Sequence, residues 1–450
     1  MARILILGAG YVAGPLVNIL HRRDENVLTV ASQFLHEAEA LAAGRPRITP
    51  AVLDVNDADA LGGLIAAHDL TVSFVPYLFH MQVASQCLKH GKHLVTASYE
   101  QPAMKALDAE VAAKGLTFLN EIGLDPGIDH LSAMRIIDEA HAAGGKVESF
   151  VSWCGGLPAP EANDNPLGYK FSWAPRAVLL ALLNEARFRR DGTDVVLNKE
   201  QLLPSTAPVD VGAEFELEGY PNRNSLNYES IYGIHGVRDL LRGTLRYRGF
   251  AAILQAAKQA GLLDMEAYPA LQTGAAPLTW RALIAAGLSL PVEAVEREFP
   301  FDATVRAAFA WLGLFGEALV PQAGNRLDAF CELLKARLQY QPGERDMVVL
   351  HHKFVIRNAN GSSTQKTSTL IAYGEPGGYT AMAKTVGIPA ALAAQLILDG
   401  VITRRGVVLP VFADVYQPLL EALEAEGIGC DERELAENNP AFLRELRYNV

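Results

Sequence analysis

The first fourteen residues constrain the fold of this chain more than any other segment. Residues 2–7 are an apolar, β-branched run that predicts a buried parallel strand. A glycine-rich turn follows over residues 8–14, and residues 15–20 continue with helical apolar spacing. A strand, a glycine turn and a helix are the context in which a G-x-G-x-x-A pattern predicts a dinucleotide-binding site.

Each small residue of this turn has a physical role in that prediction. Gly8 permits the tight turn, Gly10 leaves room for a pyrophosphate, and Ala13 lets the helix pack closely on the strand. The free N–H groups of the helix N-terminus then face the phosphates. The alternative is an ordinary strand-to-helix turn that is rich in glycine.

The bulk composition narrows the class of protein. The 450 residues suffice for two or three domains, and half of them are apolar. A net charge of −12 argues against a nucleic-acid partner. We find no signal peptide and no apolar run long enough to span a membrane, and we expect a cytoplasmic protein. The four cysteines (Cys87, Cys154, Cys331, Cys430) are scattered without metal-ligand spacing, which indicates reduced thiols and no metal.

The alternation of strands and helices continues through the first part of the chain. Strands are predicted over residues 2–7, 26–31, 48–53, 70–75, 93–97 and 116–120, with an amphipathic helix over 80–89. This pattern predicts an α/β fold with a Rossmann doubly wound parallel sheet over residues 1–130. Ligands of such sheets bind at the carboxyl ends of the strands.

The character of the chain changes after Asp129. We predict a helix over 131–142 and strands over 146–153, 213–217, 244–247, 346–356 and 368–373, which would form a second, mixed sheet. Residues 250–340 show helical periodicity and no convincing strand. An amphipathic helix over 380–399 could pack back onto the first domain. The predicted domains are therefore 1–130 with a returning segment from about 380 to 450, 131–249 with 341–379, and a helical insert over 250–340.

Two strand ends carry side chains suited to chemistry. Tyr99 follows the fifth strand, so its phenol should project toward the ligand, although an aromatic cap on the sheet is the simpler alternative. Asp125 lies after the sixth strand and precedes Pro126, which favours an extended conformation. We expect Asp125 to be functional, Asp129 to cap the following helix, and His130 to be a packing or capping residue.

The long segment over residues 154–176 is too polar and too interrupted by glycine and proline to belong to a hydrophobic core, so we predict a loop. Loops of this length tend to be functional. It contains the cations Lys170 and Arg176, and residues 222–225 and 243–248 add further arginines. Basic residues in such loops of an acidic chain suggest a pocket for carboxylates. The alternative is that these are solvated surface arginines.

Together these segments resemble the glutamate-forming saccharopine dehydrogenases, also called saccharopine reductases, of lysine metabolism. The resemblance runs essentially end to end. It is carried by residues 8–14, 96–99, 123–130, 154–176, 222–225 and 243–247, of which 124–130 and 154–158 are the most specific. It implies a Rossmann domain and a mixed α/β substrate and dimerisation domain with an all-helical insert, and hence a homodimer.

The resemblance also implies an activity and a set of site residues. The enzyme would use a nicotinamide cofactor to reduce, reversibly, the imine of L-glutamate and L-2-aminoadipate 6-semialdehyde, giving saccharopine. The implied substrate contacts are Ser98, Tyr99, Asp125, Arg223, Thr244, Leu245 and Arg246. The implied cofactor contacts are Gly8, Gly10, Tyr11, Val12, Ala13, Ser32, Gln33, Asp54, Val55, Val75, Thr96, Ala97, Ser98, Leu124, Asp125, Pro126 and Ala174.

Three groups are expected nearest the reacting nitrogen: Tyr99, Asp125 and Cys154. Asp125 would favour an iminium electrostatically, and Tyr99 or a water would relay protons. Cys154 is an unlikely nucleophile, because the reaction needs no covalent intermediate.

Two departures from the fungal enzymes concern the cofactor. Those enzymes carry an arginine past the second strand, where this chain has Ala31, Ser32 and Gln33, with neither an acid nor an arginine. Their Ser-Trp-Ser-Pro pattern has Ala174 as its third residue here. We expect NADP, with NAD possible.

Two other functions remain open at this point. A related imine reductase such as a carboxynorspermidine dehydrogenase would need acids to hold a diamine, whereas the substrate loops here carry arginines. A non-catalytic dinucleotide-binding regulator is the second alternative, and the presence of Tyr99 and Asp125 disfavours it.

Overall fold

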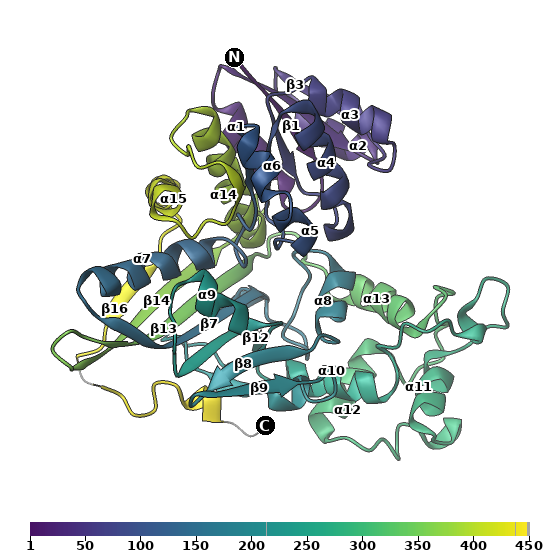
Figure 1. Ribbon diagram of the computed structural model, residues 1–450. Coiled ribbons are helices and arrows are strands. Elements are labelled where there is room, and N and C mark those ends of the chain that lie inside the picture. Colours follow the sequence, from purple (N-terminus) through teal and green to yellow (C-terminus); the bar gives the residue numbers. More distant parts are fainter. Residues whose placement is uncertain (213, 437, 448–450) are drawn as a thin grey trace. The chain divides into compact units, whose positions relative to one another are not determined.

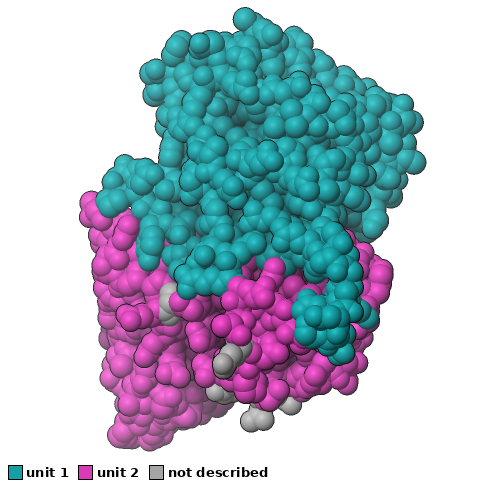
Figure 2. Space-filling view, turned by 90° about the vertical axis from the view of Figure 1, so that its left-hand side faces the viewer, with its two compact units in different colours: residues 1–146, 357–362, 370–433 teal, residues 147–356, 363–369, 434–450 magenta. Residues whose placement is uncertain are grey.

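The computed structural model describes residues 1–212, 214–436 and 438–447. Two compact units divide the chain (Figure 1; Figure 2). Unit 1 comprises residues 1–146, 357–362 and 370–433, and unit 2 comprises residues 147–356, 363–369 and 434–450. The three-part domain division drawn from the sequence stays a prediction.

Unit 1 contains a parallel sheet with helices along the chain between its strands. Its elements are β1 (Ala2–Leu7), α1 (Ala13–His21), β2 (Asn26–Ser32), α2 (Leu35–Ala42), β3 (Ile48–Val52), α3 (Ala58–Ala66), β4 (Leu70–Ser73), α4 (His80–His90), β5 (His93–Thr96), α5 (Pro102–Lys105), α6 (Asp108–Ala113), β6 (Thr117–Leu119), α7 (Ile128–Ala142), α14 (Ala381–Leu398), β15 (Gly406–Val408) and α15 (Ala413–Ala425), with β16 (Asp431–Glu434) at its end.

The strand order of this sheet is β15-β6-β5-β4-β1-β2-β3, and neighbouring strands are parallel. The order reverses after β1, which has β2 on one side and β4 on the other. Ligands of doubly wound sheets bind at such a switch point. The apolar side chains from Ile4 to Leu7 are fully buried, as their uninterrupted run predicts. The predicted Rossmann sheet is confirmed.

The C-terminal part of unit 1 completes this sheet. β15 pairs with β6 and is a seventh strand, so the prediction of six strands was incomplete. At three residues, β15 is too short to show an apolar period in the sequence. The predicted helix over 380–399 is α14, and the Thr380 hydroxyl caps it by accepting the Ala383 N–H at 2.9 Å.

Two glycines let α14 lie close against α1 within unit 1 (Figure 1). A Cβ on Gly387 would lie 2.6 Å from the Val12 carbonyl oxygen and 3.0 Å from the Leu16 nitrogen. A Cβ on Gly14 would lie 2.6 Å from the ring of Tyr379. The helix that follows the glycine-rich turn is therefore held in place by chain from the far end of the sequence.

By length and composition, α14 is apolar enough to cross a membrane, contrary to the prediction that no run is long enough. In the structure 72% of this 18-residue helix is buried. A helix that is apolar on most sides is what the interior of a large unit requires.

Unit 2 is built around a second sheet. Its elements are β7 (Lys146–Pro158), α8 (Pro175–Ala181), β8 (Ala186–Arg190), β9 (Thr193–Leu197), β10 (Ala207–Val209), β11 (Leu217–Pro221), α9 (Tyr228–Ile231), β12 (Asp239–Tyr247), α10 (Phe250–Gln259), α11 (Trp280–Leu288), α12 (Ala303–Leu312), α13 (Arg326–Arg337), β13 (Asp346–Arg357) and β14 (Ser363–Tyr373).

This second sheet is mixed, as predicted. β12 runs parallel to β7 and antiparallel to β11 and β8. The described residues from 250 to 340 form helices and turns without a named strand, in agreement with their helical periodicity. The predicted fold class is therefore confirmed for both sheets.

Several predicted boundaries in this region were wrong. β7 continues to Pro158, so residues 154–158 are buried strand and not polar loop. Two glycines and the terminal Pro158 hid this continuation. Of the strand predicted over 213–217, residue 213 lies outside the described residues, and the observed strand β11 begins at Leu217. The short strands β8, β9 and β10 were missed.

We predict that Gly387→Ala lowers the free energy of unfolding by about 1–3 kcal/mol, because its methyl group overlaps the Val12 carbonyl. Urea unfolding of the purified variant measures this loss. Gly63→Ala on α3 is the matched control, since its Cβ would meet no atom within 4 Å. The control should gain about 0.5–1 kcal/mol. Equal stabilities of the two variants would contradict the close approach of α14.

Candidate functional site

The first two glycines of the turn after β1 differ in their surroundings: the fold requires Gly8, whereas the space around Gly10 is open. Gly8 has φ +102°, and a Cβ there would lie 2.8 Å from the Phe74 carbonyl oxygen, so the fold itself requires glycine. A Cβ on Gly10 would meet no atom within 4 Å. Packing therefore does not demand glycine at this position. The open approach to the start of α1 at Ala13 fits a pyrophosphate.

The predicted cofactor residues of unit 1 gather at one edge of the parallel sheet. Gly8, Gly10, Tyr11, Val12 and Ala13 follow β1; Ser32 and Gln33 end β2; Asp54 and Val55 follow β3; Val75 follows β4; Thr96, Ala97 and Ser98 end β5; and Leu124, Asp125 and Pro126 follow β6. Parallel strands bring these ends together. Ala174 belongs to unit 2, where it precedes α8. The assignment of each residue to the cofactor stays a prediction.

Exposed apolar side chains mark the same edge, a feature that the sequence analysis missed. Tyr11 is 65% exposed, Phe34 55%, Val52 60% and Leu78 82%. Each lies at or just after the carboxyl end of a strand. Large exposed apolar groups gathered at one place are typical of a surface that a ligand covers.

The loops after β5 and β6 bring Tyr99 and Asp125 together. The Tyr99 hydroxyl donates to Asp125 Oδ1 at 3.1 Å. Two backbone hydrogen bonds join the same loops, from the Glu121 N–H to the Ser98 carbonyl (3.1 Å) and from the Ile122 N–H to the Thr96 carbonyl (3.2 Å). The residues with the strongest chemical signal in the sequence are therefore direct neighbours.

Glu121 connects these loops to the start of α7, a role that the sequence analysis missed because no local pattern marks it. It is 5% exposed and has φ +57°, an uncommon backbone conformation for a residue with a side chain. Its Oε1 accepts the Glu100 N–H and its Oε2 contacts His130 Nε2, each at 2.8 Å. His130 is fully buried, which agrees with a packing role.

Asp129 stabilises the N-terminus of α7, although not as the predicted cap of a helix beginning near 131. The helix begins at Ile128, and Asp129 Oδ1 accepts the Gly127 N–H at 2.6 Å from within the first turn. The Asp125–Pro126 peptide bond is cis. A Cβ on Gly127 would collide with the backbone of Gly123, so the loop that presents Asp125 requires glycine there.

His80 lies under this loop region and was not singled out in the sequence. It is 2% exposed at the start of α4. Its Nδ1 lies 3.0 Å from the Ser73 hydroxyl and its Nε2 lies 2.7 Å from the Ser98 hydroxyl. Burial lowers the pKa of His80 to about 4, so the ring is neutral at pH 7. A neutral imidazole between two hydroxyls fixes the direction of the Ser98 side chain.

In unit 2, the paired strands β7 and β12 place Cys154 beside Thr244. Cys154 is 9% exposed and lies within the strand, one residue after Trp153. Leu245 is fully buried, whereas Arg223 is exposed and has φ +54°. The structure thus puts Thr244, Leu245 and Cys154 together.

Arg246 on β12 is the most unusual of the predicted substrate residues. It is 4% exposed, and its guanidinium lies over the rings of Tyr169 (5.0 Å), Phe250 (5.1 Å) and Tyr220 (5.9 Å). Its Nη1 donates to the Leu245 carbonyl at 2.7 Å, and its buried Nε has no hydrogen-bond partner among the described residues.

Among the described residues, the hydrogen bond of the Arg246 side chain goes to the Leu245 carbonyl, and no carboxylate forms an ion pair with it within 4 Å. Glu218 stands opposite it in the strand register, but the Glu218 carboxylate accepts the Ala251 N–H instead. Aromatic rings contribute about 0.5–2 kcal/mol to a cation, less than the several kcal/mol that its burial costs. Arg246 is therefore suited to bind an anion that the chain does not supply.

The other cations proposed from the sequence have partners within the chain. Lys170 is 3% exposed and lies 2.7 Å from Glu344 Oε1 and 2.9 Å from Asp164 Oδ1. Arg176 Nε lies 2.7 Å from Asp328 Oδ1. Both cations therefore already have acidic partners within the chain, and their role in a carboxylate pocket stays a prediction.

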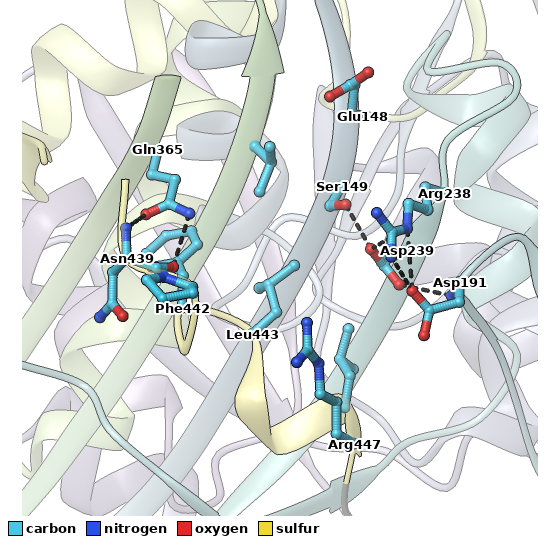
Figure 3. Close-up of a pocket in the computed structure, with 13 residues that line it drawn as sticks. Glu148, Ser149, Asp191, Arg238, Asp239, Gln365, Asn439, Phe442, Leu443 and Arg447 are labelled. Carbon is cyan, nitrogen blue, oxygen red and sulfur yellow. Dashed lines mark hydrogen bonds and ion pairs between the residues drawn. The ribbon is translucent and has the colours of Figure 1, made fainter. Parts of the chain in front are cut away.

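A cavity of about 190 Å³ in unit 2 lies among none of the predicted site residues (Figure 3). Arg238 pairs with Asp191 at its wall, and the Ser149 hydroxyl donates to Asp239 Oδ2 at 2.6 Å. These two polar pairs are satisfied within the chain, and none of the predicted site residues lines the cavity. Among the described residues, no group of three His, Cys, Asp or Glu side chains could hold a metal ion.

The doubly wound sheet, the glycine turn with its open approach to α1, and the polar residues at the strand ends define a dinucleotide-binding protein of the Rossmann type. The family description "Saccharopine dehydrogenase NADP binding domain" matches residues 4–119, and "Saccharopine dehydrogenase C-terminal domain" matches residues 123–428. The chain belongs to the saccharopine dehydrogenase family.

Individual relatives agree with this assignment. A saccharopine dehydrogenase [NADP(+), L-glutamate-forming] of Schizosaccharomyces pombe is 42% identical over 96% of this chain and 99% of its own length. The mitochondrial alpha-aminoadipic semialdehyde synthase of Bos taurus is 43% identical over 95% of this chain, which spans 47% of that relative. The apo saccharopine dehydrogenase (L-Glu forming) of Saccharomyces cerevisiae has 40% identity and a TM-score of 0.89, with 97% and 100% of the two chains covered.

We predict that His80 makes the protein less stable as the pH falls. Burial keeps its pKa near 4, whereas an exposed histidine has a pKa of 6.5, so between these values the unfolded chain binds a proton that the folded chain does not. The resulting loss is at most roughly 3 kcal/mol and is complete below pH 4. Urea unfolding of wild type and His80→Gln from pH 7 to pH 4.5 measures it.

The His80→Gln variant should show a shallower dependence on pH, by up to one proton taken up on unfolding. The buried His351, whose pKa is also lowered to about 3, retains part of the dependence in both proteins. Exposed His36→Gln is the control and should follow the wild type. Parallel curves for wild type and His80→Gln would contradict a neutral His80.

Proposed function

We propose that this chain is a nicotinamide-dependent saccharopine dehydrogenase of the L-glutamate-forming type. It interconverts saccharopine with L-glutamate and L-2-aminoadipate 6-semialdehyde by oxidation of a secondary amine and reduction of an imine. Fungal relatives that bear this name match over 99% of their length. Within the chain itself, the observation that carries the proposal is the buried Arg246, a cation without a carboxylate partner in the described structure.

Saccharopine has the groups that such a cation needs. Its two amino-acid halves carry several carboxylates around one secondary amine. A carboxylate bound by Arg246 would take the place of the missing counter-charge, and it could also accept a hydrogen bond from the free Nε. The aromatic rings of Tyr169 and Phe250 keep the guanidinium in place without competing for its N–H donors.

The cofactor is NADP, with NAD as a second candidate. When bound, the nicotinamide cofactor would supply the hydride acceptor for the lysine-derived carbon next to the secondary amine. Gly10 and the start of α1 at Ala13 are the groups that would hold the pyrophosphate. The residues at the ends of β2 and β3 would receive the adenosine half.

Asp125 and Tyr99 are proposed to act at the reacting nitrogen. Loss of hydride makes this nitrogen part of an iminium, and the Asp125 carboxylate stabilises the positive charge. The Tyr99 hydroxyl, which donates to Asp125, can pass a proton between the amine and water. Water then hydrolyses the imine to glutamate and the aldehyde. Cys154 is placed beside the substrate as a polar neighbour, because no step needs a covalent bond to the chain.

The chain would act on a small-molecule substrate. Assembly as a homodimer and a cytoplasmic location stay predictions from the sequence. Light scattering of the purified protein after size-exclusion chromatography tests the first of them.

Absorbance at the nicotinamide band tests the proposed activity, with saccharopine and either NADP or NAD added to the enzyme. We expect reduction of the cofactor and release of glutamate, which glutamate oxidase detects independently. Turnover of carboxynorspermidine in place of saccharopine would favour the related imine reductase. Cofactor binding without turnover of either compound would favour a non-catalytic regulator.

We predict that Asp125→Ala lowers turnover of saccharopine at least a hundredfold, because the iminium loses its counter-charge. Steady-state rates at saturating substrate measure kcat, and circular dichroism checks that the variant is folded. Tyr99→Phe should have a smaller effect, since it removes only the proton relay. A folded Asp125→Ala variant with a near-normal kcat would remove Asp125 from the mechanism.

We predict opposite effects of Arg246→Met on binding and on stability. Loss of the cation should raise KM for saccharopine by a factor of 30 or more, on the order of 2–5 kcal/mol of lost binding energy. The melting temperature without substrate should stay unchanged or rise, because an isolated buried charge is costly. Arg248→Met, two residues along on the surface, is the control and should change neither quantity. A marked loss of stability in Arg246→Met would show that the cation serves the fold.

A further inference from the structure

The carboxyl end of β2 holds a carboxylate that the local sequence does not reveal. The Ser32 hydroxyl, at the last residue of β2, donates to Glu37 Oε2 at 2.8 Å and accepts the Phe34 N–H at 3.2 Å. Glu37 comes from the first turn of α2. The side chain is therefore drawn back toward the strand end, although it lies five residues away in sequence.

This strand end is next to the glycine-rich turn. The Gly8 N–H donates to the Ala31 carbonyl at 2.8 Å, so the turn after β1 and the end of β2 are adjacent. In a doubly wound sheet the adenosine ribose lies at this point. A carboxylate there accepts a hydrogen bond from the ribose 2′-hydroxyl, whereas a cation there accommodates a 2′-phosphate.

The charges around this position are acidic. The neighbouring strand β3 is followed by Asp54, which is exposed and accepts hydrogen bonds from Asn56. His36 is the only basic side chain from residue 26 to residue 44, and its ring lies beside Phe34, with the centroids 6.1 Å apart. Arg45, the arginine nearest to Glu37 in sequence, donates to the Leu41 carbonyl and the Tyr379 hydroxyl. These carboxylate acceptors fit a ribose hydroxyl better than a 2′-phosphate.

We infer that Glu37, held by Ser32, narrows the difference in affinity of this chain for the two nicotinamide dinucleotides, because it weakens the binding of NADP relative to that of NAD. Its carboxylate accepts the free 2′-hydroxyl of NAD. The 2′-phosphate of NADP carries negative charge into the same place and meets repulsion. The inference rests on dinucleotide binding by the proposed enzyme and not on its substrate, so it can be tested without turnover.

Calorimetric titration of the purified protein with NAD and with NADP, without substrate, measures both dissociation constants. In Glu37→Gln we expect NADP to bind at least fivefold more tightly and NAD to bind equally or more weakly. Glu39→Gln is the matched control: it removes the same charge from α2, but Glu39 is exposed and is not bonded to Ser32. The control should keep the wild-type ratio of the two constants.

Ser32→Ala provides a second variant that keeps the charge and removes its tether. It should move the ratio toward NADP, but less than Glu37→Gln does. Raising the salt from 0.05 M to about 0.5 M should also favour NADP in the wild type, because screening weakens the repulsion, and should have less effect in Glu37→Gln.

The opposing account is that the Ser32–Glu37 hydrogen bond only stabilises the start of α2. In that case Glu37→Gln would lower the melting temperature and change both dissociation constants by the same factor. That result would overturn the inference, and so would the absence of binding of both nucleotides to the wild type. Failure to oxidise saccharopine would overturn the proposed reaction alone.

Discussion

The buried carboxylate of Glu121 is the contact on which the catalytic edge of unit 1 depends. It ties together three pieces of backbone: the loop after β5 through Glu100, the loop after β6 through its own position, and the start of α7 through His130. A left-handed backbone conformation costs about 1–3 kcal/mol and persists only where the surroundings hold it. The hydrogen bonds of Glu121 stabilise this backbone conformation. In the resulting arrangement the Tyr99 hydroxyl lies 3.1 Å from Asp125 Oδ1.

Pre-organisation of this kind favours the chemistry proposed for Asp125 and Tyr99. Proton transfer and charge stabilisation depend first on distance and direction. Glu121 fixes the two loops, and the neutral His80 fixes the Ser98 hydroxyl from below. In unit 2, Arg246 is a buried cation among aromatic rings, and its proposed role is to bind a carboxylate of the substrate.

Local patterns predicted much of this structure, and contacts between distant residues account for what they missed. The run from Ala2 to Leu7 and the glycine turn gave the sheet and the place of the cofactor, because period and turn chemistry are local signals. Tyr99 and Asp125 were found because strand ends converge. β15 and Glu121 have no local signature, since each acquires its role from a partner that the fold brings near. The link from Ser32 to Glu37 spans only five residues and was missed because no period or turn pattern marks it.

Contacts formed only in the folded chain also decide which of the cations singled out in the sequence already has an acidic partner. Lys170 and Arg246 look alike in sequence, as single positive charges near glycine or aromatic residues. In the structure, Glu344 and Asp164 neutralise Lys170, whereas Arg246 has no carboxylate partner among the described residues. Only the folded chain shows which buried cation remains available to a ligand, because Glu344, one of the two acids that pair with Lys170, lies far away in sequence.

The most direct test of the central claim is a crystal structure of the protein with saccharopine bound. The account predicts that the secondary amine lies within hydrogen-bond distance, about 3 Å, of the Asp125 carboxylate or the Tyr99 hydroxyl. It also predicts that the loops fixed by Glu121 keep their present hydrogen bonds. An amine that faces only solvent or other side chains, with Asp125 and Tyr99 still bonded to each other and away from the substrate, would contradict it.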